Sequence, residues 1–401
     1  MQNCCLPIEL CELIMDLVVE PFPRWKRFHW STDCRPGNVV HCARVCSAWL
    51  PRARCVLYSS VLFKNPSQVQ HFINSITESP LLADMVRELV IKPEDDNTYI
   101  PFVHERLLGR LRYLRTLVYD FARGRAWVYP PHHHLLIARF PLTELAIRYP
   151  CRDANPAMWF ETFRLICSLH HLHTLHLYIG TSPGLSDADI VRLDTIRRLP
   201  ACAKIETLVI EGANFYEFLP KGAFGTSVRQ LTLRFYSGPI LTSGPWLSQI
   251  ASFSSLQELH IRVDSSGEPG EDDCAVYRYI APILTHISDR EIPLHTITFH
   301  MGPIQGQKRE EFLLQLSSRN VDKLLVKFTK LETLRFWLSE RPCSGYDTMR
   351  WRNLLDDYLP KLPQGSVSIS IEVDSDMYAP ASSSLPASLT DIFTLPRQPT
   401  E

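Results

Sequence analysis

The chain has 401 residues, of which 45% are hydrophobic, so it is long enough for two or three domains with sizeable cores. Its 42 lysines and arginines nearly balance its 43 aspartates and glutamates, which gives a formal net charge of -1. This balance provides no global electrostatic attraction to nucleic acid or to an anionic membrane. We therefore expect neither of them as a partner.

The first residues, MQNCCLPIELCELIMDLVVE, contain an apolar run that acidic residues interrupt and that no basic segment precedes. This pattern is typical of neither a secretory signal nor a membrane-spanning helix. We predict an intracellular protein, cytoplasmic or nuclear. The 12 cysteines include no Cys-x-x-Cys pair, so we expect free thiols, many of them packed as small hydrophobic side chains.

Two apolar stripes at helical spacing occur in the first sixty residues. After Pro7, which suits the first turn of a helix, the first stripe comprises Leu10, Leu13, Ile14 and Leu17. Three prolines and a glycine then interrupt the pattern over residues 20–38. The second stripe comprises Cys42, Val45, Cys46 and Trp49. The two cysteines therefore indicate one apolar helix face rather than a metal site, and Pro51 predicts a break or kink near Leu50.

The stretches LPIELCELIMDLV and CARVCSAWLPRARCVLYSSVLF, with a variable gap between them, resemble the F-box, the short helical module of ubiquitin-ligase substrate receptors. The resemblance implies docking on a Skp adaptor, which joins the module to a cullin–RING ligase. It assigns adaptor contact to Leu6, Pro7, Glu9, Leu10, Ile14, Leu17, Val45, Cys46 and Trp49. The alternative is that residues such as Leu13, Ile14, Cys42 and Trp49 form only the module's own core.

A six-residue pattern with apolar first, fourth and sixth positions recurs through the rest of the chain. It appears as VRELVI, LRTLVY, LTELAI, LHTLHL, IETLVI, VRQLTL, LQELHI, LHTITF and LETLRF, and a last strand-like run, SVSISIEV, begins at Ser366. Stretches between these runs, such as NPAMWFETFRLICSLHHL and REEFLLQLSSRNVDKLLVKF, carry apolar residues at helical spacing. Strands that alternate with helices in this way predict stacked repeats.

This alternation is similar to a leucine-rich-repeat solenoid, although the Asn or Cys that usually follows the third apolar position is missing. The alternative α/β fold is a doubly wound sheet, but no glycine-rich phosphate-binding turn occurs. We predict an α/β protein with three parts. They are an all-α F-box-like module at residues 1–63 with a long loop at about 20–38, an irregular leucine-rich-repeat-like solenoid of parallel strands at 64–373, and a disordered tail at 374–401.

Few residues suggest chemistry. The runs His132–His134 and His170–His176 lack further donors at a familiar metal-binding spacing, and RWKRFHW is too short to predict nucleic-acid binding. No nucleophile elbow, zinc-protease helix or phosphate-binding loop is present. We predict no catalytic residues, no cofactor and no metal.

Side chains alternate along a strand, so residues between the apolar positions of each repeat share the opposite face. This rule predicts an open, concave face rich in Arg, Tyr and Trp, which are typical of protein interfaces. Its candidate target-binding residues are Arg148, His176, Tyr178, Arg234, His260, Arg262, His300, Arg335 and Trp337. The alternative is an ordinary solvated face that binds nothing.

The leading hypothesis is a non-enzymatic substrate receptor of an SCF-type cullin–RING ubiquitin ligase. It would hold a Skp adaptor through the F-box-like module and an unidentified protein target through the repeats. The alternative is a repeat scaffold outside any ligase, in which the F-box-like segment is an N-terminal cap. An enzyme is the third possibility, and a deep pocket with convergent titratable groups would favour it.

Overall fold

Two compact units make up the computed structural model of this chain, the first extending to Leu57 and the second beginning at Tyr58. The structure describes residues 7–19, 36–45, 48–94, 98–121, 133–149, 156–179, 204–212, 224, 226–236, 250, 252–264, 280–301, 307–339, 348–362 and 367–374. Most of the loop predicted at about 20–38 and all but the first residue of the tail predicted at 374–401 lie outside these residues.

The first unit contains the helices α1 (Ile8–Val19), α2 (Pro36–Ala43) and most of α3 (Leu50–Ser59). Its core is a small cluster of five buried side chains from these helices and the turn before α3. They are Cys11, Met15, Val39, Trp49 and Ala53. Cysteine and methionine serve here as apolar filling, as expected for a small helical core.

The prediction of one helix face from Cys42 to Trp49 is wrong, because α2 ends at Ala43 and α3 begins at Leu50. Pro51 lies in the first turn of α3, where its missing N–H would have no helical partner, so it begins a helix instead of breaking one. Val45 is exposed in the turn between the helices, whereas Trp49 is buried.

The second unit is built on one parallel sheet of 11 strands, whose order in space is their order in sequence. The strands are β1 (Ser60–Phe63), β2 (Glu88–Ile91), β3 (Thr116–Asp120), β4 (Glu144–Tyr149), β5 (Thr174–Ile179), β6 (Thr207–Glu211), β7 (Gln230–Tyr236), β8 (Glu258–Asp264), β9 (Thr296–Met301), β10 (Thr333–Ser339) and β11 (Ser368–Asp374). Each run of the predicted pattern contributes one strand, and the run that begins at Ser366 contributes β11. Strand β1 was not predicted as part of the sheet, and it pairs with β2.

The register aligns equivalent repeat positions from strand to strand, so the apolar residues stack in continuous rows. Leu89, for example, pairs with Leu117 and Leu117 with Leu145, and all three are fully buried. The first apolar position of each run, such as Val86 or Leu114, lies just before its strand and is also buried. One cluster of buried side chains therefore runs from Phe63 to Leu362, as stacked repeats require.

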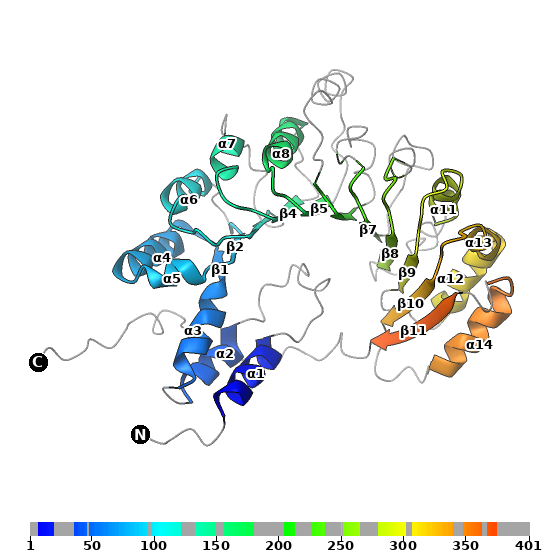
Figure 1. The fold of residues 1–401 in the computed structure, drawn as a ribbon, viewed down its shortest axis with the longest axis horizontal. Helices are drawn as coiled ribbons and strands as arrows, with labels where there is room; N and C mark the ends of the chain where they lie inside the picture. Colours follow the sequence, from blue (N-terminus) through cyan, green and yellow to red (C-terminus); the bar gives the residue numbers. More distant parts are fainter. Residues whose placement is uncertain are drawn as a thin grey trace, which may run out of the picture. The chain divides into compact units, whose positions relative to one another are not determined.

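Helices follow many of the strands and lie on one side of the sheet (Figure 1). They are α4 (Pro66–Glu78), α5 (Leu81–Met85), α6 (Ile100–Leu107), α7 (His133–Ile137), α8 (Pro156–Ser168), α11 (Ile280–Ser288), α12 (Gln307–Ser318), α13 (Val321–Leu325) and α14 (Thr348–Tyr358). Sequential strand order with helices on one face confirms a solenoid-like repeat and excludes a doubly wound sheet, which has helices on both faces. Within the described residues, no helix combines the length and hydropathy needed to cross a membrane.

Candidate functional site

Helix α1 has two apolar stripes, and its packing buries only one of them. Cys11 and Met15, four residues apart, are fully buried in the core of the first unit. Leu10, Leu13 and Ile14 lie on another side of the helix and are exposed, with Leu13 at 54% of its full accessible surface. Spacing alone cannot choose between two apolar stripes, because tertiary packing decides which of them becomes core.

The structure places the predicted adaptor-contact residues in different environments. Pro7 and Glu9 are exposed, like Leu10, Ile14 and Val45, and are accessible to a partner. Leu17 lies in α1, and Leu6 and Cys46 lie outside the described residues. The assignment of Trp49 needs correction, because only 8% of its surface is exposed and it packs in the core of the unit.

All nine predicted target-binding residues lie on the face of the sheet opposite the helices, which we call the polar face. Six of them belong to one row of register partners across the strands, which we call the charged row. It runs Asp120, Arg148, Tyr178, Glu211, Arg234, Arg262, His300, Trp337 and Glu372. The other three, His176, His260 and Arg335, lie two positions earlier in their strands, in the neighbouring row.

The N-terminal end of the charged row is organised around Asp120, which is buried. Lys92 Nζ lies 3.6 Å from Asp120 Oδ2, and an Arg148 terminal nitrogen lies 3.8 Å from Asp120 Oδ1. The guanidinium carbon of Arg148 lies 4.7 Å from the centre of the Tyr178 ring, a cation–π contact. Arg148 therefore contacts both Asp120 and Tyr178, and Arg148 and Tyr178 are partly exposed.

A second buried carboxylate, Glu211, holds the centre of the polar face. Its Oε1 lies 2.8 Å from His176 Nε2, and its Oε2 accepts a hydrogen bond of 3.1 Å from Arg234. The expectation that the nine residues are open to solvent is wrong for His176, Arg234 and Arg262, which are buried. A buried ion pair needs hydrogen-bonded partners to offset desolvation, and Glu211 provides them for two of these side chains.

The strands β8, β9 and β10 carry a cluster of rings and cations that we call the β8–β10 patch: His260, Arg262, His300, Arg335 and Trp337. The rings of His260 and His300 lie 5.6 Å apart, and those of His300 and Trp337 stack at 5.5 Å. His260 Nδ1 lies 3.4 Å from His300 Nε2. Arg335 is exposed, and its charge helps to lower the pKa of Glu258. The patch thus presents an accessible cation beside a stack of aromatic rings.

Burial lowers the pKa of His300 well below its ordinary value, and the nearby charges of His260, Arg262 and Arg234 lower it further. His300 is therefore neutral at pH 7. The hydrogen bond from His260 lowers the pKa of Glu258, whose Oε2 lies 3.5 Å from His260 Nε2, while partial burial opposes that effect. Glu258 is therefore ionised and partly balances the cations of the patch.

Strand alternation in the sequence predicts the basic and aromatic residues of the polar face, but the two buried carboxylates that hold several of them were not predicted. Asp120 and Glu211 have the same strand parity as Arg148 and Arg234. The alternation rule that found the cations would have placed them too, had it been applied to acidic residues.

The described residues of the histidine runs have separate surroundings. His133 is buried against His104, with ring centres 4.8 Å apart, and His104 Nε2 lies 2.8 Å from the Tyr119 hydroxyl. His170, His171 and His173 are exposed, unlike His176. Among the described residues, no three His, Cys, Asp or Glu side chains are grouped as a metal site.

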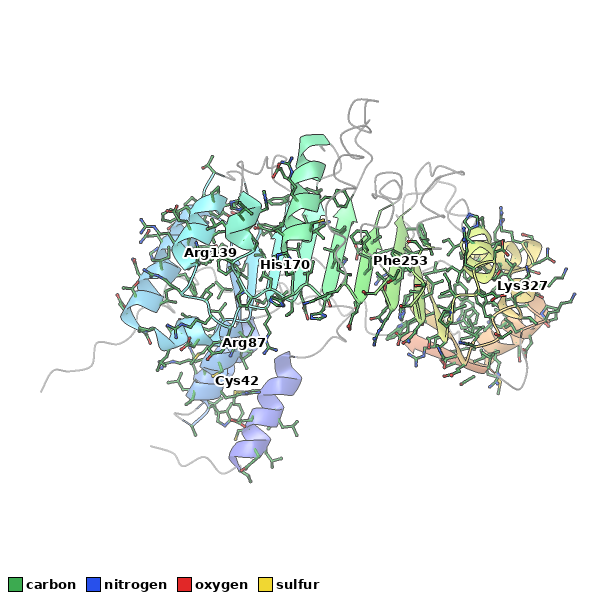
Figure 2. All side chains as sticks on the ribbon, turned by 45° about the horizontal axis from the view of Figure 1, so that its top comes forward. Cys42, Arg87, Arg139, His170, Phe253 and Lys327 are labelled. Atoms are coloured by element: carbon green, nitrogen blue, oxygen red, sulfur yellow. The ribbon has the colours of Figure 1, made fainter. Side chains whose placement is uncertain are left out.

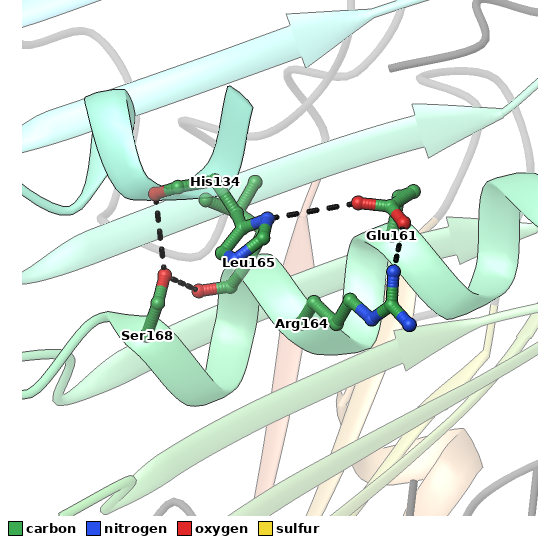
Figure 3. A network of polar contacts seen from close by, with 5 residues as sticks. All are labelled: His134, Glu161, Arg164, Leu165 and Ser168. Atoms are coloured by element: carbon green, nitrogen blue, oxygen red, sulfur yellow. Dashed lines mark hydrogen bonds and ion pairs between the residues drawn. The ribbon is translucent and has the colours of Figure 1, made fainter. Parts of the chain in front are cut away.

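A polar network joins α7 to α8 beside the first histidine run (Figure 3). Ser168 Oγ donates to the carbonyl oxygen of Leu165 at 2.7 Å, and the carbonyl oxygen of His134 lies 3.4 Å from the same hydroxyl. Glu161 Oε2 lies 3.6 Å from His134 Nδ1, and Glu161 Oε1 accepts a hydrogen bond from Arg164. These contacts connect consecutive helices of the solenoid and do not form a catalytic constellation of nucleophile and base.

Neither the family models nor the curated proteins include a match to this sequence. Among solved structures, a protein of Bacteroides fragilis gives a TM-score of 0.40 at 11% identity, over 80% of this chain and 76% of the other. The arginine decarboxylase of Paramecium bursaria Chlorella virus gives 0.22 at 12% identity, over 53% and 54%. Its agmatine-bound form gives 0.23 at 13% identity, over 53% and 55%. All three scores are too low to support an argument about this chain.

Proposed function

We propose that this chain is a non-enzymatic substrate receptor of an SCF-type cullin–RING ubiquitin ligase. In this proposal the first unit docks on a Skp-type adaptor, and the polar face of the sheet binds a protein target. The receptor contributes proximity, because it holds the target near the subunits that transfer ubiquitin. Ubiquitin transfer then occurs within one complex and does not require an encounter between separate molecules.

The observation that carries the proposal is the exposed stripe of Leu10, Leu13 and Ile14 on α1. Their helix already buries Cys11 and Met15, so the exposed leucines and isoleucine are surplus to the core of the unit. Exposed apolar side chains that gather on one helix face are typical of a protein interface. The stripe lies within the segment whose sequence resembles an F-box.

Replacing Leu13 with glutamate is expected to reduce recovery of the Skp-type adaptor and cullin at least about tenfold, because an interface would have to bury the new charge. Leu314→Glu is the matched control, since both leucines are helical and 54% exposed. The measurement is co-purification of the tagged full-length chain from its native cells, with quantitative mass spectrometry and circular dichroism of each variant. Trp49 is unsuitable for this test, because its replacement would disrupt the core.

Recovery of the adaptor by the wild type and the Leu314→Glu variant, but not by Leu13→Glu, supports the proposal. Equal recovery by all three, or recovery by none of them, contradicts it. If no folded form binds an adaptor, the alternative of a repeat scaffold outside any ligase becomes the better explanation.

The β8–β10 patch is the part of the polar face that best suits a protein target. Arg335 is an accessible cation, and the stacked rings of His300 and Trp337 beside it are partly exposed. Arginine and tryptophan are typical of interface hot spots, and the stacked rings of the patch lose little conformational entropy on binding.

Arg335→Glu is expected to abolish recovery of the target while it leaves adaptor recovery unchanged. Arg352→Glu, an exposed arginine on α14, makes the same charge change away from the sheet and is the control. The measurement compares crosslinked partners of the two variants by mass spectrometry. A partner lost only with Arg335→Glu is the expected result, whereas identical partner sets would exclude the patch as the target site.

A further inference from the structure

A groove of about 760 Å³ lies between α11 and the segment that contains α13, on the helical side of the sheet. This volume lies within the range of roughly 300–1,000 Å³ that small-molecule sites occupy. Ala281, Pro282 and Leu324 provide apolar lining, and the polar lining is dominated by basic side chains. Figure 2 marks one of these, Lys327.

Three cations line the groove at intervals of four residues: Arg319, Lys323 and Lys327. His286 from α11 also lines it, and none of the lining residues is acidic. Within the part of the chain that the structure describes, the three cations form no ion pair. Like charges that line one groove repel one another, so this arrangement disfavours the empty groove electrostatically.

The local backbone explains why the cations gather. Helix α12 ends at Ser318, and Asn320 then adopts a left-handed conformation with φ of 54° and ψ of 39° before α13 begins. Asparagine tolerates this conformation better than most residues. The turn leaves Arg319 just after α12, while Lys323 lies within α13 and Lys327 just after α13.

Arg319 is the least solvated of the three cations. It is half-buried, and its Nε is shielded from solvent without a hydrogen-bond partner among the described residues. Partial burial reduces the screening of its charge, so a bound anion would interact with it more strongly than with a fully exposed arginine.

We propose that this groove binds a phosphomonoester, with the phosphoryl group among Arg319, Lys323 and Lys327 and the rest of the ligand against the apolar lining. A phosphoryl group carries nearly two negative charges and three acceptor oxygens, which matches three cations better than a single carboxylate does. The site lies on the opposite side of the sheet from the polar face, and the proposal does not depend on a role in a ubiquitin ligase.

The test measures binding of phenyl phosphate to the full-length chain by calorimetry and by thermal unfolding, against sodium chloride of equal ionic strength. We expect saturable binding of phenyl phosphate and at least about tenfold weaker binding of benzoate, which has the same ring and one charge fewer. Inorganic phosphate and a short phosphoserine peptide are also measured, because both contain the phosphoryl group but lack the phenyl ring. Whether the peptide or phenyl phosphate binds more tightly identifies the natural source as a modified protein or a small molecule.

The double variant Lys323→Gln/Lys327→Gln is expected to weaken phenyl phosphate binding more than about tenfold, since it removes two charge-assisted contacts. Lys204→Gln/Lys361→Gln removes the same charge from exposed lysines elsewhere and should bind like the wild type. Three outcomes would overturn the proposal: no saturable binding, benzoate binding as tightly as phenyl phosphate, or equal loss of affinity in both double variants.

Discussion

Replacing Glu211 with alanine is expected to lower the free energy of unfolding by about 3–5 kcal/mol, as loss of one partner of a buried ion pair typically does. Glu211 holds His176 at 2.8 Å and Arg234 at 3.1 Å, and all three side chains are buried. Without the carboxylate, the guanidinium of Arg234 would stay buried and would lose its ion pair with Glu211. That desolvated charge, rather than the lost contact itself, accounts for most of the expected cost.

Urea unfolding of the full-length chain, followed by circular dichroism, measures this change. Glu258→Ala is the control, because Glu258 is exposed and also lies beside a histidine, His260, at 3.5 Å. Its replacement should cost less than about 1 kcal/mol, as for surface ion pairs. If both variants lose the same stability, Glu211 is not the central partner of the polar face.

The two buried carboxylates divide the polar face into parts with different roles. Asp120 lies between Lys92 and Arg148, and Glu211 lies between His176 and Arg234. The two carboxylates therefore offset much of the positive charge of the basic side chains beside them. Beyond Arg234 the charged row continues with Arg262, His300 and Trp337 and has no carboxylate before β11. Positive charge and aromatic surface therefore accumulate on β8–β10, the part of the polar face at which we propose that a protein target binds.

The strands of the solenoid were predictable because each repeat encodes its own local signal. In one repeat, Leu142 is buried just before the strand, and Leu145 and Ile147 point from the strand into the core. Because the repeats stack, each of them needs apolar residues at the same three positions. Strand β1 was missed because Val61 and Leu62 also fitted the end of the F-box resemblance. The break between α12 and α13 was missed because the apolar spacing continues through Asn320, whose left-handed backbone has no signal in hydrophobic periodicity.

The sites were harder to predict than the strands, because periodicity predicts the side to which a side chain points but not how deeply that side chain is buried. Strand parity placed Arg234 and Arg335 correctly on the same face, yet Arg234 is buried against Glu211 and Arg335 is exposed. In α1 both stripes are apolar, so the choice of Cys11 over Leu10 as core depends on what the other helices supply. Such outcomes follow from tertiary contacts, which a single sequence does not encode locally.

A buried histidine pair on the helical side of the sheet makes stability depend on pH. His104 Nδ1–H donates to the Ile100 carbonyl oxygen at 2.8 Å, so Nε2 of the neutral ring accepts a hydrogen bond from the Tyr119 hydroxyl, and the ring also contacts His133. Burial, and then the neighbouring His133, lower the pKa of His104 to about 3, although the carbonyl contact opposes them. Burial, and then His134, lower the pKa of His133 to about 4. Both imidazoles are therefore neutral in the folded protein at pH 5.

The free energy of unfolding is expected to fall as the pH drops below about 6.5, where the histidines of the unfolded chain take up protons. The folded-state pKa of His104 is depressed, so its contribution is fully present above 6.5 and is lost as pH falls toward 3, by about 1.4 kcal/mol per pH unit. The His104→Gln variant keeps a hydrogen-bonding group near Tyr119 but cannot titrate. Its free energy of unfolding should therefore fall less steeply between pH 6 and 4.5, by that amount per pH unit.

Urea unfolding at a series of pH values measures how the free energy of unfolding changes with pH. His170→Gln, the same change at an exposed position, should retain the wild-type slope, and equal slopes in all three proteins would show that His104 is not buried in its neutral form.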